Sequence, residues 1–236
     1  MKTIFITGAS RGIGFETANS LLRHPDVRLI LSSRNSKKLE TWKQRLSPSM
    51  AEAITTVELD LEDDVDFEAF GEKIQNFVEI DVLINNAGLL INKPFEKLAP
   101  DVWRKVFEVN FFGVVRLVQN LLPKMKAAPS AHIVNIGSMG GFQGSSKFAG
   151  LSAYSASKAA LANLTECLAG ELAPYQIKSN CLCLGAVNTE MLSRAFPGYK
   201  APLESQDMGK FIADFCLNGD RFFNGQILPV ALNDPE

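Results

Sequence analysis

Two kinds of stretch alternate along the chain. Short runs such as IFI, LIL and VLI are apolar at nearly every position, whereas the longer stretches between them repeat apolar residues at helical spacing. Strands that are apolar throughout are typical of a sheet covered by helices on both faces. The pattern predicts strands over 2–7, 27–32, 53–59, 82–85, 132–137, 177–184 and 226–230, and helices near 12–23, 36–47, 63–78, 101–126, 151–173 and 204–218.

The order of these elements predicts the fold class. Strands and helices alternate as βαβα, which predicts an α/β protein with a Rossmann-type, doubly wound parallel sheet of about seven strands and helices on both faces. We find no internal repeat, linker or low-complexity segment, so we expect a single domain over 1–236. In such a sheet, ligands bind beyond the carboxyl ends of the strands.

Composition narrows the classes of function. The net charge of −2 and a 46% hydrophobic content are ordinary for a globular protein and give no indication of a nucleic-acid surface. No apolar stretch reaches the length of a membrane span, and the first strand begins near residue 2, so we expect a cytoplasmic protein without membrane contact. The four cysteines and two histidines form no local ligand cluster, and we expect no metal site.

The first predicted strand ends in T-G-A-S-R-G-I-G, residues 7–14, and a helix follows. Glycine lets the backbone turn tightly and approach a pyrophosphate, while the helix N-terminus offers free N–H groups and a positive dipole end. A glycine cluster between a first strand and a first helix predicts a dinucleotide phosphate loop.

The end of the second strand indicates which dinucleotide is bound. An acidic residue there would accept hydrogen bonds from an unphosphorylated ribose, but the strand ends in Ser33 and Arg34. Together with Arg11 in the glycine loop, these residues offer a hydroxyl and two guanidinium groups to a 2′-phosphate. We therefore expect NADPH or NADP+ rather than NADH.

A tyrosine and a lysine four residues apart, Tyr154 and Lys158, share one face of a predicted helix. A phenol with its usual pKa near 10 is a poor base at neutral pH. We expect the ammonium group, with an oxidised nicotinamide, to lower the pKa of the phenol toward working pH. Ser138 ends the preceding strand, and Asn110 lies inside a helix, where a buried amide needs a hydrogen-bond partner.

Taken together, these motifs resemble the short-chain dehydrogenase/reductase family. The T-G-x-x-x-G-x-G loop, N-N-A-G, mid-helix asparagine, strand-end serine and Y-x-x-x-K occur in the family's order from Thr7 to Lys158, with a further match at 185–189. Two departures are visible. Leu184 stands where the family has proline, and the tail keeps G-Q-x-x-x-V but lacks the closing glycine pair.

The resemblance implies reduction of a carbonyl to an alcohol, or the reverse, by hydride transfer. Tyr154 would exchange the proton, Ser138 would bind the carbonyl oxygen, Lys158 would hold the nicotinamide ribose, and Asn110 would hold a water in a proton relay. It implies a cofactor site made of Gly8, Ser10, Arg11, Gly12, Ile13, Gly14, Ser33, Arg34, Asp60, Leu61, Asn86, Ala87, Gly88, Tyr154, Lys158, Val187 and Thr189.

Two segments are predicted to border the substrate. One is the Gly- and Ser-rich segment from Ser138 to Tyr154, with Met139, Phe142, Phe148 and Leu151 as apolar contacts. The other, from 191 to 202, is predicted to be a mobile lid with apolar surface and a bend at Phe196, Pro197 and Gly198.

Substrate and assembly stay open at this level. A 3-oxoacyl-(acyl carrier protein) reductase would need basic residues at the cleft mouth, with Lys124, Lys126 and Arg194 as weak candidates. A catalytically silent NADP(H)-binding regulatory protein would be expected to lack one of Ser138, Tyr154 and Lys158, and all three are present. Small residues along the helix 151–173 suit either packing on the sheet or a symmetric contact, and we expect a homodimer or homotetramer.

Overall fold

The structure, a computed structural model, describes residues 1–62 and 67–232 of the chain. Its centre is a parallel sheet whose seven strands, within the described residues, follow the order β3-β2-β1-β4-β5-β6-β9. The predicted doubly wound α/β fold is thereby confirmed. The strands are β1 (Lys2–Ile6), β2 (Val27–Ser33), β3 (Ile54–Glu58), β4 (Val82–Asn85), β5 (Ala131–Ser138), β6 (Ile177–Leu184) and β9 (Ile227–Val230).

Both faces of the sheet are buried, as its apolar strands predict. Along β1, Ile4 and Ile6 pack into one core cluster, and Phe5 between them packs into the other, all three without solvent exposure. Successive side chains of a strand point to opposite faces, so a strand of this composition is stable only with helices on both sides.

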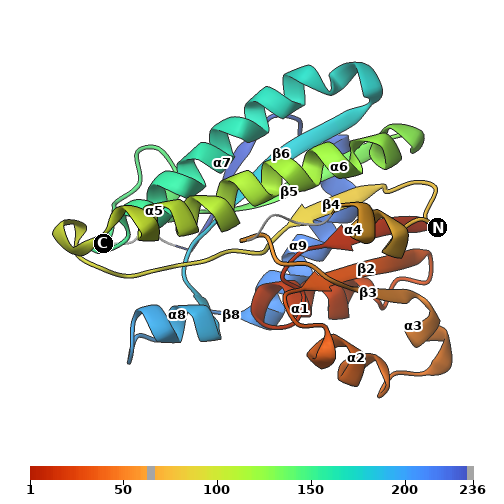
Figure 1. Ribbon diagram of the computed structural model, residues 1–236, viewed down its shortest axis with the longest axis horizontal. Helices are drawn as coiled ribbons and strands as arrows, with labels where there is room; N and C mark the ends of the chain where they lie inside the picture. Colours follow the sequence, from red (N-terminus) through yellow and green to blue (C-terminus); the bar gives the residue numbers. More distant parts are fainter. Residues whose placement is uncertain (63–66, 233–236) are drawn as a thin grey trace.

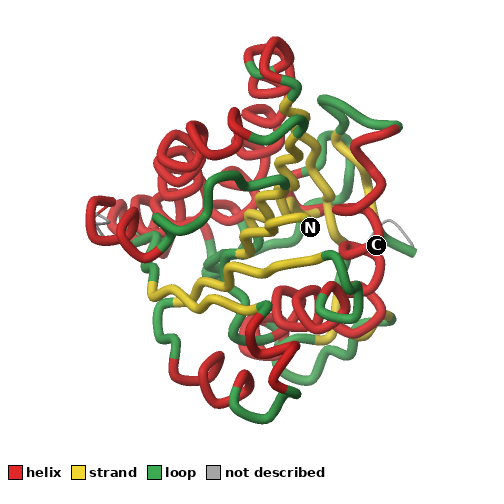
Figure 2. Tube along the Cα trace, turned by 90° about the vertical axis from the view of Figure 1, so that its right-hand side faces the viewer, coloured by secondary structure: helices red, strands yellow, loops and turns green. Residues whose placement is uncertain are grey.

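The helices form one layer on each face (Figures 1 and 2). One layer contains α1 (Gly12–Leu21), α2 (Lys37–Lys43) and α9 (Ser205–Asn218), whose apolar residues belong to the same core cluster as Ile4. The other contains α4 (Phe67–Lys73), α5 (Pro100–Phe107), α6 (Gly113–Ala127) and α7 (Ser152–Glu171). Among the described helices, none is both long enough and apolar enough to cross a membrane.

Three predicted helices differ from those observed. The helix predicted near 101–126 is interrupted between α5 and α6 by a π-helical turn, η2 (Glu108–Phe112), which contains Asn110. The helix predicted near 36–47 ends at Lys43, and a second short helix, α3 (Pro48–Glu52), starts on a proline at its N-terminus, where the missing N–H costs nothing. Of the helix predicted near 63–78, residues 63–66 lie outside the described residues, and the rest is α4.

A small excursion leaves the sheet after β6. It consists of β7 (Val187–Asn188), α8 (Glu190–Ala195) and β8 (Leu203–Glu204), with β7 and β8 paired in parallel. The Asn188 side chain holds its ends together, because Oδ1 accepts from Ala201 N at 2.7 Å and Nδ2 donates to Ala201 O at 3.1 Å. In Figure 1, α8 lies apart from the helical layers, beyond the sheet. The sequence predicted only a mobile lid here.

Short 3-10 turns complete the connections. They are η1 (Phe95–Lys97), η3 (Met139–Gly141), η4 (Ala173–Tyr175) and η5 (Gly219–Arg221).

Candidate active site

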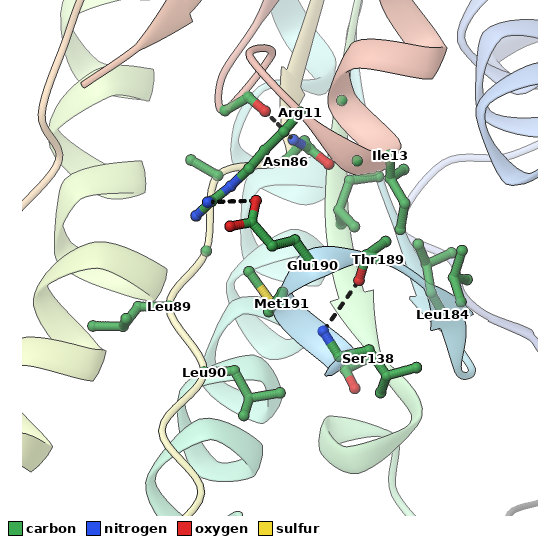
Figure 3. A pocket seen from close by; sticks show the side chains of 18 of the residues that line it. Arg11, Ile13, Asn86, Leu89, Leu90, Ser138, Leu184, Thr189, Glu190 and Met191 are labelled. Carbon is green, nitrogen blue, oxygen red and sulfur yellow. Dashed lines mark hydrogen bonds and ion pairs between the residues drawn. The ribbon is translucent and has the colours of Figure 1, made fainter. Parts of the chain in front are cut away.

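A cavity of about 850 Å³ lies at the carboxyl edge of the sheet, between the core strands and α8. Every residue predicted for the cofactor and for catalysis lines it, with the exception of Asn110, which is buried behind its wall. Figure 3 shows that the lining side chains come from the glycine loop, the segment after β4, the end of β5 and α8. The predicted position, beyond the carboxyl ends of the strands, therefore agrees with the structure.

The glycine loop requires its glycines. Gly8 and Gly12 adopt positive φ angles of 66° and 56°, a region that other residues rarely occupy. A Cβ atom on Gly8 would lie 2.8 Å from the Ala87 Cα, and one on Gly14 would overlap the Asn86 side chain. The loop therefore packs directly on the N-N-A-G segment.

Thr7 joins these two motifs, which lie about 80 residues apart. Its hydroxyl accepts hydrogen bonds from the backbone N–H groups of Asn86 at 3.0 Å and Ala87 at 2.9 Å. In return, the Asn86 amide donates to the Thr7 carbonyl at 2.8 Å and to the Gly8 carbonyl at 3.2 Å. The two segments form one rigid floor beneath the place where a dinucleotide backbone would lie.

Ser138, Tyr154 and Lys158 meet at the end of β5. Ser138 is the last residue of the strand, and Tyr154 and Lys158 occupy successive turns of α7. The Lys158 Nζ donates to the Ile136 carbonyl at 2.7 Å and lies 6.0 Å from the centre of the Tyr154 ring. The turn after β5 packs closely on α7 because Gly141 has no side chain: a Cβ at this position would lie 2.6 Å from the backbone of Lys158.

Asn110 is fully buried, and its amide has the partners that the sequence required. Its Oδ1 accepts from Leu89 N at 2.7 Å, while Nδ2 donates to Leu89 O and to the Ser157 hydroxyl, both at 2.9 Å. Ser157 in turn donates to the Tyr154 carbonyl at 2.7 Å. Asn110 thus links the segment after β4 to the turn of α7 that carries Tyr154, and Ser157 is a participant that sequence reasoning missed.

Asn110 and Lys158 both approach the backbone at Gly88. A Cβ on this glycine would lie 3.5 Å from the Asn110 Oδ1 and 3.6 Å from the Lys158 Nζ. Both polar atoms therefore face the same small space beside the chain.

The ionisation of the two central groups follows from burial. Burial lowers the pKa of Lys158 to about 8 because an ammonium group loses its hydration there. The pKa of Tyr154 is raised, mainly by burial, although a hydrogen bond with Ser138 opposes the rise. Within the chain itself, loss of hydration of the phenolate dominates. The lowering of the Tyr154 pKa predicted for Lys158 together with an oxidised nicotinamide stays a prediction.

The corner at the end of β2 collects positive charge. Ser33 and Arg34 line it as predicted, and Lys38 on the first turn of α2 joins them. The Ser33 hydroxyl donates to the Asn35 carbonyl at 2.9 Å. Sequence reasoning missed Lys38, although a cation at the start of the helix that follows Arg34 was a usable signal. Asp60, beyond β3, lines the adjacent wall.

Arg11 forms an ion pair within the chain, and its predicted contact with a 2′-phosphate stays a prediction. Its Nη1 donates to the Glu190 Oε2 at 2.8 Å, and the pair spans the cavity from the glycine loop to α8 (Figure 3). This hydrogen bond with Arg11 holds the pKa of the Glu190 carboxyl below its usual value. Arg194 pairs with the same carboxylate. Arg11 therefore links the glycine loop to α8 through Glu190.

The segment after β6 also differs in detail. Thr189, predicted to contact a nicotinamide, caps α8 by accepting from Leu192 N at 3.2 Å while it lines the cavity. Leu184 completes the β6 strand in register with Val230 of β9, so the absent proline leaves a regular strand end.

The predicted substrate contacts divide into two groups. Met139, Phe148, Leu151 and Phe196 line the cavity, whereas Phe142 packs on the core cluster around Cys181 and Cys183 instead. Pro197 and Gly198 are exposed outside the lining. Among the lining residues of this segment, Met191 and Leu192 belong to α8, whereas Phe196, Tyr199, Pro202 and Leu203 follow it.

Comparison with known proteins gives a consistent family. A family model described as short chain dehydrogenase matches residues 2–200. Human retinol dehydrogenase 8 is 37% identical over 191 residues, covering 80% of this chain and 60% of that protein. An uncharacterized oxidoreductase of Staphylococcus saprophyticus is 35% identical over 239 residues, covering 100% of this chain and 91% of the relative.

A solved structure extends the similarity to three dimensions. The crystal structure of a putative short chain dehydrogenase from Shigella flexneri, complexed with NADP, superposes with a TM-score of 0.87 at 28% identity. The match covers 97% of this chain and 96% of that one.

Proposed function

This chain belongs to the short-chain dehydrogenase/reductase family and is an oxidoreductase, and we propose that it interconverts a carbonyl and an alcohol using NADP(H). The observation that carries the proposal is the meeting of Ser138, Tyr154 and Lys158 in one cavity with the glycine loop. A silent binding protein would have no need to keep these three groups around a common space.

Tyr154 supplies the proton in the proposed reduction. Because burial raises its pKa, the phenol is protonated at neutral pH and is ready to act as an acid. When bound, the cofactor would supply a hydride to the carbonyl carbon. The carbonyl oxygen would gain negative charge as the π electrons of C=O move to it, take the Tyr154 proton, and be stabilised by the Ser138 hydroxyl.

Lys158 and Asn110 restore the proton. With a pKa of about 8, Lys158 can give up and regain a proton near neutral pH. Its Nζ and the Asn110 Oδ1 border the same space beside Gly88, which suits a relay that ends at Tyr154. We assign the nicotinamide ribose to Lys158 by the same placement.

The cofactor preference rests on the corner at the end of β2. Arg34, Lys38 and the Ser33 hydroxyl line this corner, and guanidinium and ammonium groups suit a phosphate. The Shigella relative is complexed with NADP. The glycine loop and the N-terminus of α1, which begins at Gly12, would hold the pyrophosphate.

The basic residues considered for an acyl carrier protein do not support the alternative of a 3-oxoacyl reductase. Lys124 donates to the Phe77 carbonyl and Lys126 stacks on Tyr175, both near the amino edge of the sheet and away from the cavity. Arg194 is paired with Glu190. These three cations therefore do not form a docking surface at the cleft mouth.

We further propose that residues 1–236 act as one domain in a homodimer or homotetramer in the cytoplasm. Five small residues of α7 are exposed or half-buried, whereas the sheet is contacted by Leu161 and by Thr165, whose hydroxyl accepts from Asn135 on β5. Four free thiols suit a reducing compartment. The five small residues of α7 are Ala156, Ala160, Asn163, Cys167 and Gly170, each exposed or half-buried.

A substrate panel tests the proposal. Purified protein is incubated with aldehydes, ketones and alcohols and with either NADPH or NADH, and absorbance of the reduced cofactor is followed. We expect turnover with NADPH and a higher kcat/KM than with NADH. Equal or better activity with NADH would overturn the cofactor assignment, and no turnover with any compound would overturn the reaction.

A further inference from the structure

The cavity has two halves of different chemistry. Its charged lining residues, among those the structure describes, lie on the cofactor side or at the central Lys158 and the Arg11–Glu190 pair. Four segments form the rest, which we call the apolar half. These are residues 89–90, 139–151, 191–203 and 231–232, whose described lining residues include no charged side chain.

The charged residues within these segments point elsewhere. Lys147 is exposed, and its Nζ donates to the Ser145 hydroxyl at 2.7 Å and to the Phe142 carbonyl. Arg194 pairs with Glu190, and Lys200 is exposed outside the lining. The segments contain charged residues, but none of these side chains lines the apolar half.

Hydrogen bonds connect three of the segments that form the apolar half. From the segment after β4, Lys93 N donates to the Gly150 carbonyl at 2.9 Å, and the Asn92 Nδ2 donates to the Ala195 carbonyl at 2.9 Å. The Phe148 and Phe196 rings meet across the gap with their centroids 6.1 Å apart. Two loops far apart in the sequence thus close on one aromatic contact.

Apolar surface continues to the outside. Phe148, Tyr199 and Leu232 line the cavity and yet are 42%, 53% and 65% exposed. Large apolar side chains that are left in water around a cavity mark a binding surface. They extend the apolar half to the mouth of the cavity.

From this lining we propose that the substrate is an uncharged carbonyl compound with an apolar chain or ring, held against the Phe148–Phe196 pair with its oxygen at Ser138 and Tyr154. This rests on the proposed reductase activity and specifies its substrate class. A carboxylate, a phosphate or several hydroxyl groups would lose hydration in the apolar half without gaining a partner. Each methylene buried there should instead raise kcat/KM about fourfold.

A series of straight-chain aldehydes tests the class. Initial rates with NADPH are compared for propanal, butanal, hexanal and octanal, with succinic semialdehyde and glyceraldehyde as polar counterparts of butanal and propanal. We expect kcat/KM to rise along the series by roughly fourfold per methylene at first. Each polar counterpart should be at least about tenfold poorer than the alkanal of equal length, since a buried polar group without a partner costs at least that much.

Three variants locate the effect. Phe148→Ser and Phe196→Ser should each lower kcat/KM for octanal about tenfold, the value of roughly two buried methylenes, and leave propanal within about twofold. Phe222→Ser is the matched control, because Phe222 is 78% exposed and lies outside the cavity lining. It should leave the whole series unchanged.

The outcomes separate the two proposals. A flat aldehyde series, or a preference for succinic semialdehyde or glyceraldehyde, overturns the apolar substrate class while leaving the reductase activity in place. An octanal rate that the two phenylalanine variants leave unchanged also overturns it. No oxidation of NADPH with any of the compounds, in a protein that still binds NADPH, overturns the reductase activity itself.

Discussion

The two ends of strand β5 both carry polar side chains, but with opposite consequences. At the amino end, His132 is 1% exposed and lies 3.0 Å from the Asn180 amide through its Nε2, and its ring lies 5.6 Å from that of Phe215 at an angle of 46°. Burial lowers the pKa of this histidine to about 4, so it is neutral at physiological pH. At the carboxyl end, Ser138 and Tyr154 face the cavity.

The difference shows that an unusual polar residue in a core strand does not by itself mark a site. The His132 Nε2 is paired with the Asn180 amide inside the fold, and Asn180 also bonds the backbone of Phe223 and Gln226. Ser138 and Tyr154 instead keep polar atoms directed at open space, where a ligand can complete their bonding. In a parallel sheet, the carboxyl edge is where the connections diverge and leave this space.

Removal of the phenol should have the largest effect. In Tyr154→Phe the general acid is lost, and kcat should fall roughly a hundredfold or more. Titration of NADPH by fluorescence should give a dissociation constant close to that of the wild type. His132→Gln is the comparison from the other end of β5, and its kcat should stay within about twofold of the wild type. A Tyr154→Phe enzyme with full rate would contradict the mechanism.

Low pH should destabilise the fold through His132, at the amino end of β5. Between its folded pKa of about 4 and its unfolded value of 6.5, His132 binds fewer protons in the folded chain than in the unfolded one. The free energy of unfolding should therefore fall as the pH is lowered from about 6.5 to about 4, by about 2 kcal/mol at pH 5.

Chemical denaturation at several pH values measures this loss. His132→Gln keeps an amide in reach of Asn180 and removes the titration, so its stability should change less than that of the wild type over the same range. Parallel pH profiles for the two proteins would show that His132 is not the sensitive group.

The positive corner at β2 should have an intermediate effect. Arg34→Ala and Lys38→Ala should each raise KM for NADPH roughly tenfold, because each removes one charge-assisted bond at a partly hydrated site. KM for NADH should be nearly unchanged. Lys37→Ala is the matched control, since Lys37 is an exposed neighbour on the same helix but does not line the cavity. An equal loss for both cofactors would remove the corner from 2′-phosphate recognition.

The smallest effect is expected at the mouth of the cavity. Glu190→Gln weakens the hold on Arg11, and the freed guanidinium should lower KM for NADPH by about two- to threefold, as an exposed ion pair allows. The effect should diminish in high salt. A large increase in KM would mean instead that Glu190 is needed to position Arg11 for the cofactor.

The sequence alone determined the architecture and most of the site. Apolar runs such as residues 4–6 can be buried only between two helical layers, and this local pattern is enough to predict a doubly wound sheet. Motif order then predicted Gly8, Ser138, Tyr154 and Lys158 for the candidate site, because the spacing of glycines at a strand end and of two residues on one helix turn is local information.

Only the tertiary structure decided how distant groups meet. The pairing of Arg11 with Glu190, the bonds of Asn110 with Leu89 and Ser157, and the charge-free lining between Phe148 and Phe196 join residues from separate elements. The direction of the Tyr154 pKa shift also depended on burial by the whole fold. Periodicity records which face of an element is buried, but not which side chain of another element it will face.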